Sequence, residues 1–221
     1  MASVTSQGDA PPIRGRRSPR VSGEDRERAI LATAERLLEE RPLHEISIDD
    51  IARGAGISRP TFYFYFPSKE AVLLTLLDRM VEEARTGRGA TLERFAEDPP
   101  HWLRHAITAI YETFRSHRAA TLAAADAQAT SAEVRELWAR VMEQFVVETT
   151  AAIEAERARG AAPDGVPARD LAASLNLMNE RVFHATLAAN QPAPEEEDVI
   201  DVLVHIWLAA IYSGTAFTRP G

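Results

Sequence analysis

The chain has 221 residues, of which 45% are hydrophobic and 26% charged, a composition typical of a folded globular protein with a sizeable core. It has no cysteine and no apolar run near the roughly 20 residues of a membrane helix, so we expect no disulfide, no thiolate metal site, no membrane contact and a cytoplasmic location. The net charge of −8 is uneven: residues 1–70 hold 11 Lys+Arg and 11 Asp+Glu, and the remaining residues hold 14 and 22.

The N-terminal segment is predicted to be a disordered basic arm over residues 1–23. Its stretch PPIRGRRSPR, residues 11–20, has four arginines and no acid, and its Pro, Gly and Ser residues disfavour a packed core. Residues 215–221 are likewise predicted to be a disordered tail.

The rest of the chain is predicted to be all-α. Apolar residues recur three and four positions apart, and runs of β-branched residues with period two are missing. Ser22 with Asp25 and Ser47 with Asp50 form capping boxes. The first helix is expected over 24–41, the second ends at the glycines of residues 54–56, the third starts at Ser58, and the fourth covers 68–86. Further helices are expected near 100–116, 118–128, 131–159, 168–189 and 195–213, the last with four acids, residues 195–198, in its first turn.

Residues 48–63, IDDIARGAGISRPTFY, have the spacing of a helix-turn-helix: two short capped helices joined by a turn that contains glycine. Ala52 is small where the helices cross, and Gly56 can adopt the left-handed conformation that the turn requires. An αα-corner without a ligand has the same spacing, so this pattern alone leaves that alternative open.

Residues 51–69 contain no acid, which favours a phosphate-bearing ligand at this segment. The outward positions of the third helix are Arg59, Thr61 and Tyr63, with Tyr65 just beyond. Lys69, the only lysine of the chain, falls in the first turn of the next helix, where unpaired backbone N–H groups also favour an anion.

The segment TFYFYFPSKEAVLLTLLDR, residues 61–79, resembles the TetR family of transcriptional regulators. The downstream motifs ELW (136–138), RGAAP (159–163), LNLMNER (175–181) and LVHIW (203–207) are similar to those of the EthR-like mycobacterial repressors within that family. The resemblance covers about residues 25–212. It implies a TetR-like fold with a helix-turn-helix DNA-binding domain over 24–68 and a helical ligand-binding and dimerisation domain over 69–214.

The resemblance also implies a regulator, by family tendency a repressor, that binds a near-palindromic operator of double-stranded DNA as a dimer. The third helix would then lie in the major groove, and the arginine arm could reach the adjacent minor groove. The predicted DNA-binding residues are Ser47, Arg59, Pro60, Thr61, Tyr63, Tyr65 and Lys69, together with Arg16 and Arg17 of the arm.

The helix expected over 168–189 carries large side chains on two of its faces. One of these faces places Asn176 and Asn179 beside Phe183. Buried amides among apolar walls are typical of a ligand pocket, although neighbouring helices could equally satisfy them. The resemblance implies a largely hydrophobic small-molecule effector that releases the DNA. The predicted ligand-binding residues are Ile107, Ile110, Phe114, Trp138, Met142, Phe145, Thr149, Asn176, Asn179, Glu180, Phe183 and Trp207.

The last two helices are predicted to pair with their copies in a four-helix homodimer interface, as in the family. The residues assigned to this interface are Leu171, Leu175, Met178 and Val182 on one helix and Val199, Leu203, Ile206 and Ala210 on the other.

An enzyme is not expected. His101 and His105 have no third metal ligand, Glu180 and His184 resemble a surface pair, and no nucleotide or nucleophile motif is present, so neither a metal nor a cofactor is predicted. The remaining alternative is a helical protein-interaction module without DNA binding, which would leave the acid-free third helix unexplained.

Overall fold

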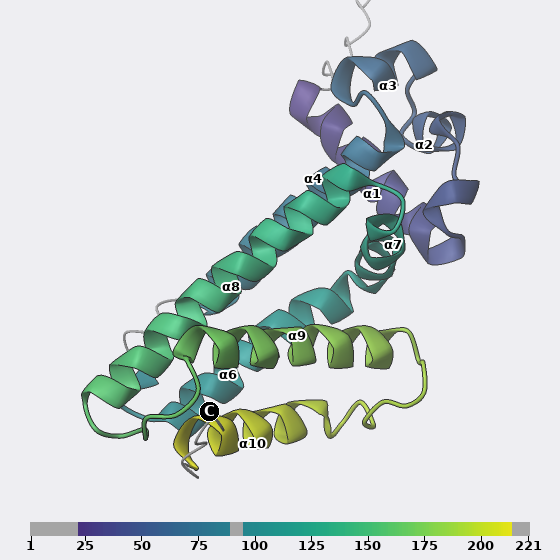
Figure 1. Ribbon diagram of the computed structural model, residues 1–221. Helices are drawn as coiled ribbons and strands as arrows, with labels where there is room; N and C mark the ends of the chain where they lie inside the picture. The colour runs from purple at the N-terminus through teal and green to yellow at the C-terminus, as the bar shows by residue number, and fades with distance from the viewer. Residues whose placement is uncertain (1–21, 89–94, 214–221) are drawn as a thin grey trace, which may run out of the picture.

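The computed structural model describes residues 22–88 and 95–213, and it is helical throughout these ranges, with no strand among them (Figure 1). The predicted all-α fold is therefore confirmed. No helix in the described ranges combines the length and the apolar character needed to cross a membrane. Arg16 and Arg17 of the predicted arm and the predicted tail lie outside the described residues.

The head of the molecule consists of α1 (Gly23–Glu40), α2 (Ile48–Gly54) and α3 (Arg59–Tyr65), with a 3-10 turn at Leu43–Glu45. Both capping boxes are confirmed, because the hydroxyls of Ser22 and Ser47 accept from the N–H of Asp25 and Asp50 and the two carboxylates accept in return. Ser58 caps α3 through the N–H of Thr61. Three serine caps thus fix where the helices of the head begin.

The turn between α2 and α3 has the conformation that the sequence predicts. Gly56 has φ +67, in the left-handed region that glycine adopts without strain. Beneath the turn, Ile51 and Phe62 are both 0% exposed and join residues of α1 in one small hydrophobic core. The core fixes α3 relative to α1 and leaves the opposite side of α3 open.

Helix α4 (Lys69–Arg88) belongs to two cores. Val72 and Leu76 pack in the core of the head, whereas Leu73, Leu77 and Met80 pack in the larger core of the body. The packing of the head therefore extends beyond residue 68, where the sequence predicts its end, and no flexible linker separates head from body.

The body contains α6 (Pro99–Ser116), α7 (Arg118–Gln128), α8 (Ala132–Ala158), α9 (Ala168–Leu187) and α10 (Val199–Tyr212). In Figure 1, α8 extends from beside the head to the far end of the molecule, where α9 and α10 lie across α6. Helix α7 packs against both α1 and α4, so the head contacts the body through two helices.

The last helix starts later than predicted, at Val199 rather than residue 195. The preceding acids form a turn closed by the bond from the N–H of Asp198 to the carbonyl of Glu195, 3.0 Å, and no side chain caps the helix. Glu195 and Asp198 would lie three positions apart on one helix face, where like charges repel, and this disfavours a helix that starts at residue 195. The expectation that these acids occupy the first helical turn is wrong.

Gly54 lies in α2 where α1 passes close by. A Cβ at this position would meet Cγ2 of Thr33 at 2.4 Å, and Thr33 is itself buried. We expect Gly54→Ala to lower the free energy of unfolding by roughly 1–3 kcal/mol, because the clash exceeds the gain in helix propensity. Gly87→Ala in α4 is the matched control, since its Cβ would meet Ala109 at 3.7 Å, an ordinary contact. Thermal unfolding that ranks the two variants equally would contradict this prediction.

Candidate DNA-binding surface and effector pocket

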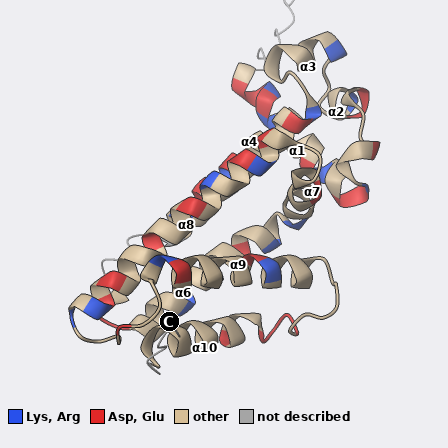
Figure 2. Ribbon diagram, in the orientation of Figure 1, with Lys and Arg blue, Asp and Glu red and all other residues tan. Residues whose placement is uncertain are grey.

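Helix α3 presents an aromatic outer face. Phe62 and Phe66 are 0% and 6% exposed and anchor the helix in the head, whereas Tyr63 and Phe64 between them are 46% and 83% exposed. The helix carries no acid, as Figure 2 shows, and it lies at the outer end of the molecule. This face is open to a macromolecular ligand.

Phe64 is a candidate functional residue that the sequence interpretation passed over. The signal was available: Phe62 and Phe66 are four positions apart and share the buried face, so the residue midway must point away from it. Phe64 is 83% exposed, and its ring lies edge-on to that of Tyr65 at 5.2 Å between centroids, so most of its surface faces outward. Its ring can contact the methyl group of thymine in a major groove.

Arg59 is held within the head by Asp49 and by Tyr63, whose hydroxyl accepts a hydrogen bond from Nη2 of Arg59 at 3.4 Å. Its Nη1 donates to Oδ2 of Asp49 at 3.0 Å, and its guanidinium lies 5.8 Å from the ring centroid of Tyr63. Residues 51–69 contain no acid, but Asp49 lies just before them. The fold brings Asp49 of α2 into contact with Arg59, ten residues later in the chain. Both side chains are about half exposed, so this ion pair is weak and can open for a phosphate or a base.

The remaining predicted DNA contacts of the head are partly engaged in local hydrogen bonds. The hydroxyl of Ser47 donates to Oδ2 of Asp50 at 2.7 Å, and the hydroxyls of Thr61 and Ser58 are 2.8 Å apart. Pro60 is exposed in the first turn of α3, and Tyr65 packs partly against the core of the head. Pro60, Thr61 and Tyr65 lie on α3 and Ser47 caps α2, but their roles in DNA binding stay predictions.

Lys69 makes contacts that the sequence does not reveal. Its ammonium donates to three backbone carbonyls, those of Leu43 at 2.7 Å, His44 at 3.3 Å and Ile46 at 2.9 Å. An ammonium has three N–H donors, so all are used inside the protein. Lys69 thereby ties the start of α4 to the turn before α2, and a phosphate would have to compete with these bonds.

The predicted effector residues converge in the body from four helices. Phe114 of α6 lies 5.9 Å from Trp138 of α8 and 6.3 Å from Phe183 of α9, measured between ring centroids. Ile107 and Phe145 are buried beside them, and the further members Ile110, Met142 and Thr149 are half-buried. Phe114, Trp138 and Phe183 of the predicted set thus form one aromatic cluster, and the other apolar members belong to the same large core of the body.

The two asparagines of α9 are buried, and each uses one side of its amide. Asn176 Nδ2 donates to Thr149 Oγ1 at 3.1 Å and to the carbonyl of Ala172 at 2.8 Å, while Asn179 Oδ1 accepts from Trp207 Nε1 at 2.9 Å. Among the described residues, neither Asn176 Oδ1 nor Asn179 Nδ2 has a hydrogen-bond partner. One acceptor and one amino group thus remain on a single helix face.

Trp138 and Glu180 close one side of the aromatic cluster through a bond from the indole Nε1 to Oε1 of the carboxylate, 2.7 Å. Together with Phe114 and Phe183 they line a cavity of about 30 Å³, which is room for little more than water. Small-molecule sites usually measure about 300–1,000 Å³. An effector would therefore have to displace aromatic side chains here.

The predicted dimer residues do not share one exposed face. Leu175, Val199 and Leu203 are 4%, 0% and 0% exposed within a single subunit, so they pack in its core and their assignment to the interface is wrong. Both helices carry apolar residues on more than one side, and the sequence does not tell which side faces inward. The exposed apolar residues here include Leu177, at 54%, and Val202, at 38%.

The rest of the predicted interface remains available for contact. Ile206 is 38% exposed, Ala210 is exposed, and the three other residues are half-buried: Leu171, Met178 and Val182. On α10, Val202, Ile206 and Ala210 follow one another at four-residue intervals, which places them on one stripe of the helix.

Within residues 22–88 and 95–213, no cluster of three or more His, Asp or Glu side chains is arranged to hold a metal ion. The pair at His101 and His105 brackets Trp102, whose ring lies edge-on to both imidazoles.

Comparison with known proteins identifies the family. Residues 30–76 match the family described as bacterial regulatory proteins, tetR family, and residues 103–213 match the C-terminal domain of the transcriptional regulator EthR. The chain is 56% identical over 211 residues to the HTH-type transcriptional regulator EthR of Mycobacterium tuberculosis (strain CDC 1551 / Oshkosh), covering 95% of this chain and 97% of that protein. The chain belongs to the TetR family of transcriptional regulators.

Two further comparisons agree with this assignment. EthR of Mycolicibacterium smegmatis is 54% identical over 199 residues, covering 90% of this chain and 92% of that protein. The crystal structure of a TetR-family regulator from Syntrophomonas wolfei aligns with a TM-score of 0.70 at 18% identity, over 90% of this chain and all of that one. The helix-turn-helix and the EthR-like resemblance are confirmed, and the relatives are regulators rather than enzymes.

The three hydrogen bonds of Lys69 should stabilise the head in the absence of DNA. We expect Lys69→Met to lower the free energy of unfolding by about 1–3 kcal/mol, because carbonyls of the 43–46 turn lose their donor while the alkyl stem is kept. Arg26→Met, on the exposed side of α1, is the control and should change stability little. Thermal unfolding measures both, and an unchanged melting temperature for Lys69→Met would leave the lysine free for phosphate.

Proposed function

We propose that this TetR-family regulator represses transcription by binding a near-palindromic operator as a homodimer, and that a largely hydrophobic small molecule releases it. The observation that carries the DNA-binding part is the outer face of α3. It is free of acids, it exposes Tyr63 and Phe64, and a buried core fixes it in place.

On DNA, α3 would lie in the major groove with Thr61 and Phe64 near base edges. Arg59 would release Asp49 and bind a phosphate or a guanine instead. Breaking the Arg59–Asp49 ion pair costs little free energy because both side chains are about half exposed. Ser47 and Tyr65 would contact phosphates at the groove edge and set the position of α3. A two-fold dimer would place two such helices about 34–36 Å apart, in successive major grooves.

The dimer would form through α9 and α10. The exposed stripe of Val202, Ile206 and Ala210, together with Leu177 of α9, supplies apolar surface that water covers in a single subunit. Burial of this surface against its own copy gives the isologous contact that a two-fold symmetric dimer requires.

The effector would enter between α6, α8 and α9 and displace the rings of Phe114, Trp138 and Phe183. Its apolar part would occupy their place. Its polar group would use the unbonded Asn179 Nδ2 as donor and Asn176 Oδ1 as acceptor. A primary or secondary amide fits this pair, because it has a carbonyl and an N–H close together.

Operator binding is tested with a duplex from the region upstream of the chain's own gene, by fluorescence anisotropy against a scrambled duplex. We expect specific binding, with affinity falling roughly 100-fold between 50 and 200 mM salt if about four phosphates are neutralised. Phe64→Ala should weaken binding to the operator by about 10-fold and leave binding to the scrambled duplex nearly unchanged.

Val147→Ala is the matched control for this experiment, because Val147 is 53% exposed on α8, away from the head. Equal affinity of the wild type for operator and scrambled duplex would contradict the proposed function. Loss of both affinities in Phe64→Ala would assign Phe64 to the stability of the head instead of to recognition.

The effector class is tested with 5-phenylpentanamide and pentylbenzene, which share a carbon skeleton. We expect the amide to bind more tightly by isothermal titration and to weaken operator binding. In Asn179→Ala, the affinity for the amide should fall about 10-fold relative to that for pentylbenzene, which corresponds to roughly one buried hydrogen bond. Asn190→Ala, an exposed position after α9, is the control. Equal binding of the two probes to the wild type would exclude an amide-recognising pocket.

A further inference from the structure

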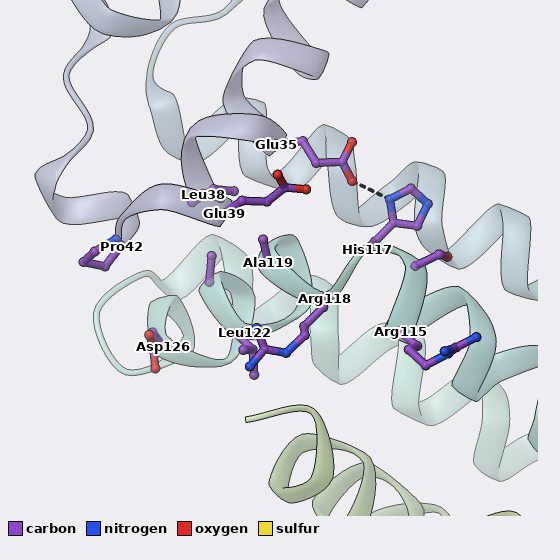
Figure 3. A pocket seen from close by; sticks show the side chains of 12 residues that line it. Glu35, Leu38, Glu39, Pro42, Arg115, His117, Arg118, Ala119, Leu122 and Asp126 are labelled. Atoms are coloured by element: carbon purple, nitrogen blue, oxygen red, sulfur yellow. Dashed lines mark hydrogen bonds and ion pairs between the residues drawn. The ribbon is translucent and has the colours of Figure 1, made fainter. Parts of the chain in front are cut away.

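His117 lies at the joint between head and body. It is the residue between the end of α6 and the start of α7, and α7 packs against α1. Figure 3 shows its imidazole directed toward Glu35 on α1, at the edge of a cavity of about 370 Å³ between the two parts. The side chain is 27% exposed.

The imidazole uses both nitrogens on carboxylates of different helices. Nδ1 lies within hydrogen-bond distance of Glu35 Oε1 of α1, and Nε2 lies 3.2 Å from Glu83 Oε2 of α4. One side chain therefore connects the α6–α7 junction with a helix of the head and with the helix that joins head and body.

This geometry requires a charged imidazole. Carboxylates only accept hydrogen bonds, and a neutral imidazole has one N–H, so one carboxylate would then face a nitrogen lone pair. The imidazolium has two N–H groups and satisfies both. Burial lowers the pKa of His117, but the bonds to Glu35 and Glu83 outweigh it, so the net pKa is raised above its usual value.

His117 is also connected to the aromatic cluster of the proposed effector pocket. Phe114 precedes it by three residues on α6, and its ring packs against Trp138 and Phe183. The carbonyl of Phe114 accepts from Thr121 Oγ1 of α7 at 3.2 Å. A molecule that displaces this ring would move the end of α6 and, with it, His117.

We propose that His117 is a positioning residue for operator binding: in its doubly hydrogen-bonded cationic form it holds α1 in the DNA-binding orientation, and effector binding at Phe114 breaks this connection. This proposal rests on the proposed function, because it is measured through operator binding. The closed aromatic cluster and the two bonds of His117 are present together in one conformation.

Among the charged side chains that face one another here, His117 is the one whose residue type is the usual pH switch. The facing groups are Glu35 and Glu39 of α1, Glu83 of α4, Arg115 of α6, and Arg118 and Asp126 of α7. Because the pKa of His117 is raised on folding, its contribution is complete at low pH and is lost as the pH rises through the folded-state value.

Operator affinity as a function of pH tests the proposal. We expect the wild type to bind about 3- to 10-fold more tightly at about pH 6 than at about pH 8, the size of a modest allosteric coupling. His117→Gln should bind like the wild type at about pH 8 and lose the gain at about pH 6. His117→Arg keeps a cation that can reach both carboxylates and should retain tight binding at about pH 8.

Two controls isolate this effect. Glu27→Gln breaks another α1–α4 ion pair, with Arg79 at 2.9 Å, and should change affinity equally at both pH values because no histidine takes part. His44→Gln removes the exposed histidine of the head and should keep the wild-type pH profile. A wild-type pH profile in His117→Gln would overturn the proposal.

Amide hydrogen exchange of residues 23–40 gives a readout that does not depend on DNA. At about pH 6, we expect faster exchange of α1 in His117→Gln than in the wild type, and the same rates at about pH 8, comparing the two proteins at each pH. Circular dichroism verifies that the variants are folded. Failure to bind any operator refutes the proposed function, whereas unchanged protection of α1 refutes the role of His117.

Discussion

The sharing of α4 between two hydrophobic cores constrains the whole molecule. Val72 and Leu76 fill the core of the head, and Leu73 and Leu77, on the neighbouring face of the same turns, fill the core of the body. The first turns of α4 are buried on two faces, each in a different core. The helix therefore cannot bend there without opening one of the cores. Under the proposed function, a movement of the body would therefore reach α3 as a reorientation of the whole head, with no change within the helix-turn-helix.

Local sequence chemistry predicted much of the fold because it acts over three or four residues. The serine caps at Ser22, Ser47 and Ser58 and the left-handed Gly56 each depend on neighbours along the chain. Contacts between distant segments were not predictable in this way. The bonds of Lys69 to the turn before α2 bring together residues 23 to 26 positions apart, and no periodicity encodes them.

The candidate sites show the same division. The asparagines of α9 were identified because amides are rare on an apolar face, but their partners Thr149 and Trp207 come from other helices. The dimer surface was partly misassigned, since α10 has apolar residues around most of its circumference and only tertiary packing places Leu203 inside and Val202 outside. Sequence patterns indicate which helices carry a site, and packing decides which face is used.

Besides the shared helix α4 and the apolar contacts of Leu38 and Leu43, polar contacts hold α1 to the body. Apolar packing resists small displacements and changes little with pH or ionic conditions, whereas a charged hydrogen bond is lost when one partner moves or loses a proton. Where α1 meets the body, the ion pair of Glu27 with Arg79 and the two bonds of His117 supply such contacts. A regulator needs a rigid recognition helix and an adjustable orientation of that helix. Under the proposed function, a bound molecule would break these polar contacts between α1 and the body while both hydrophobic cores stay intact.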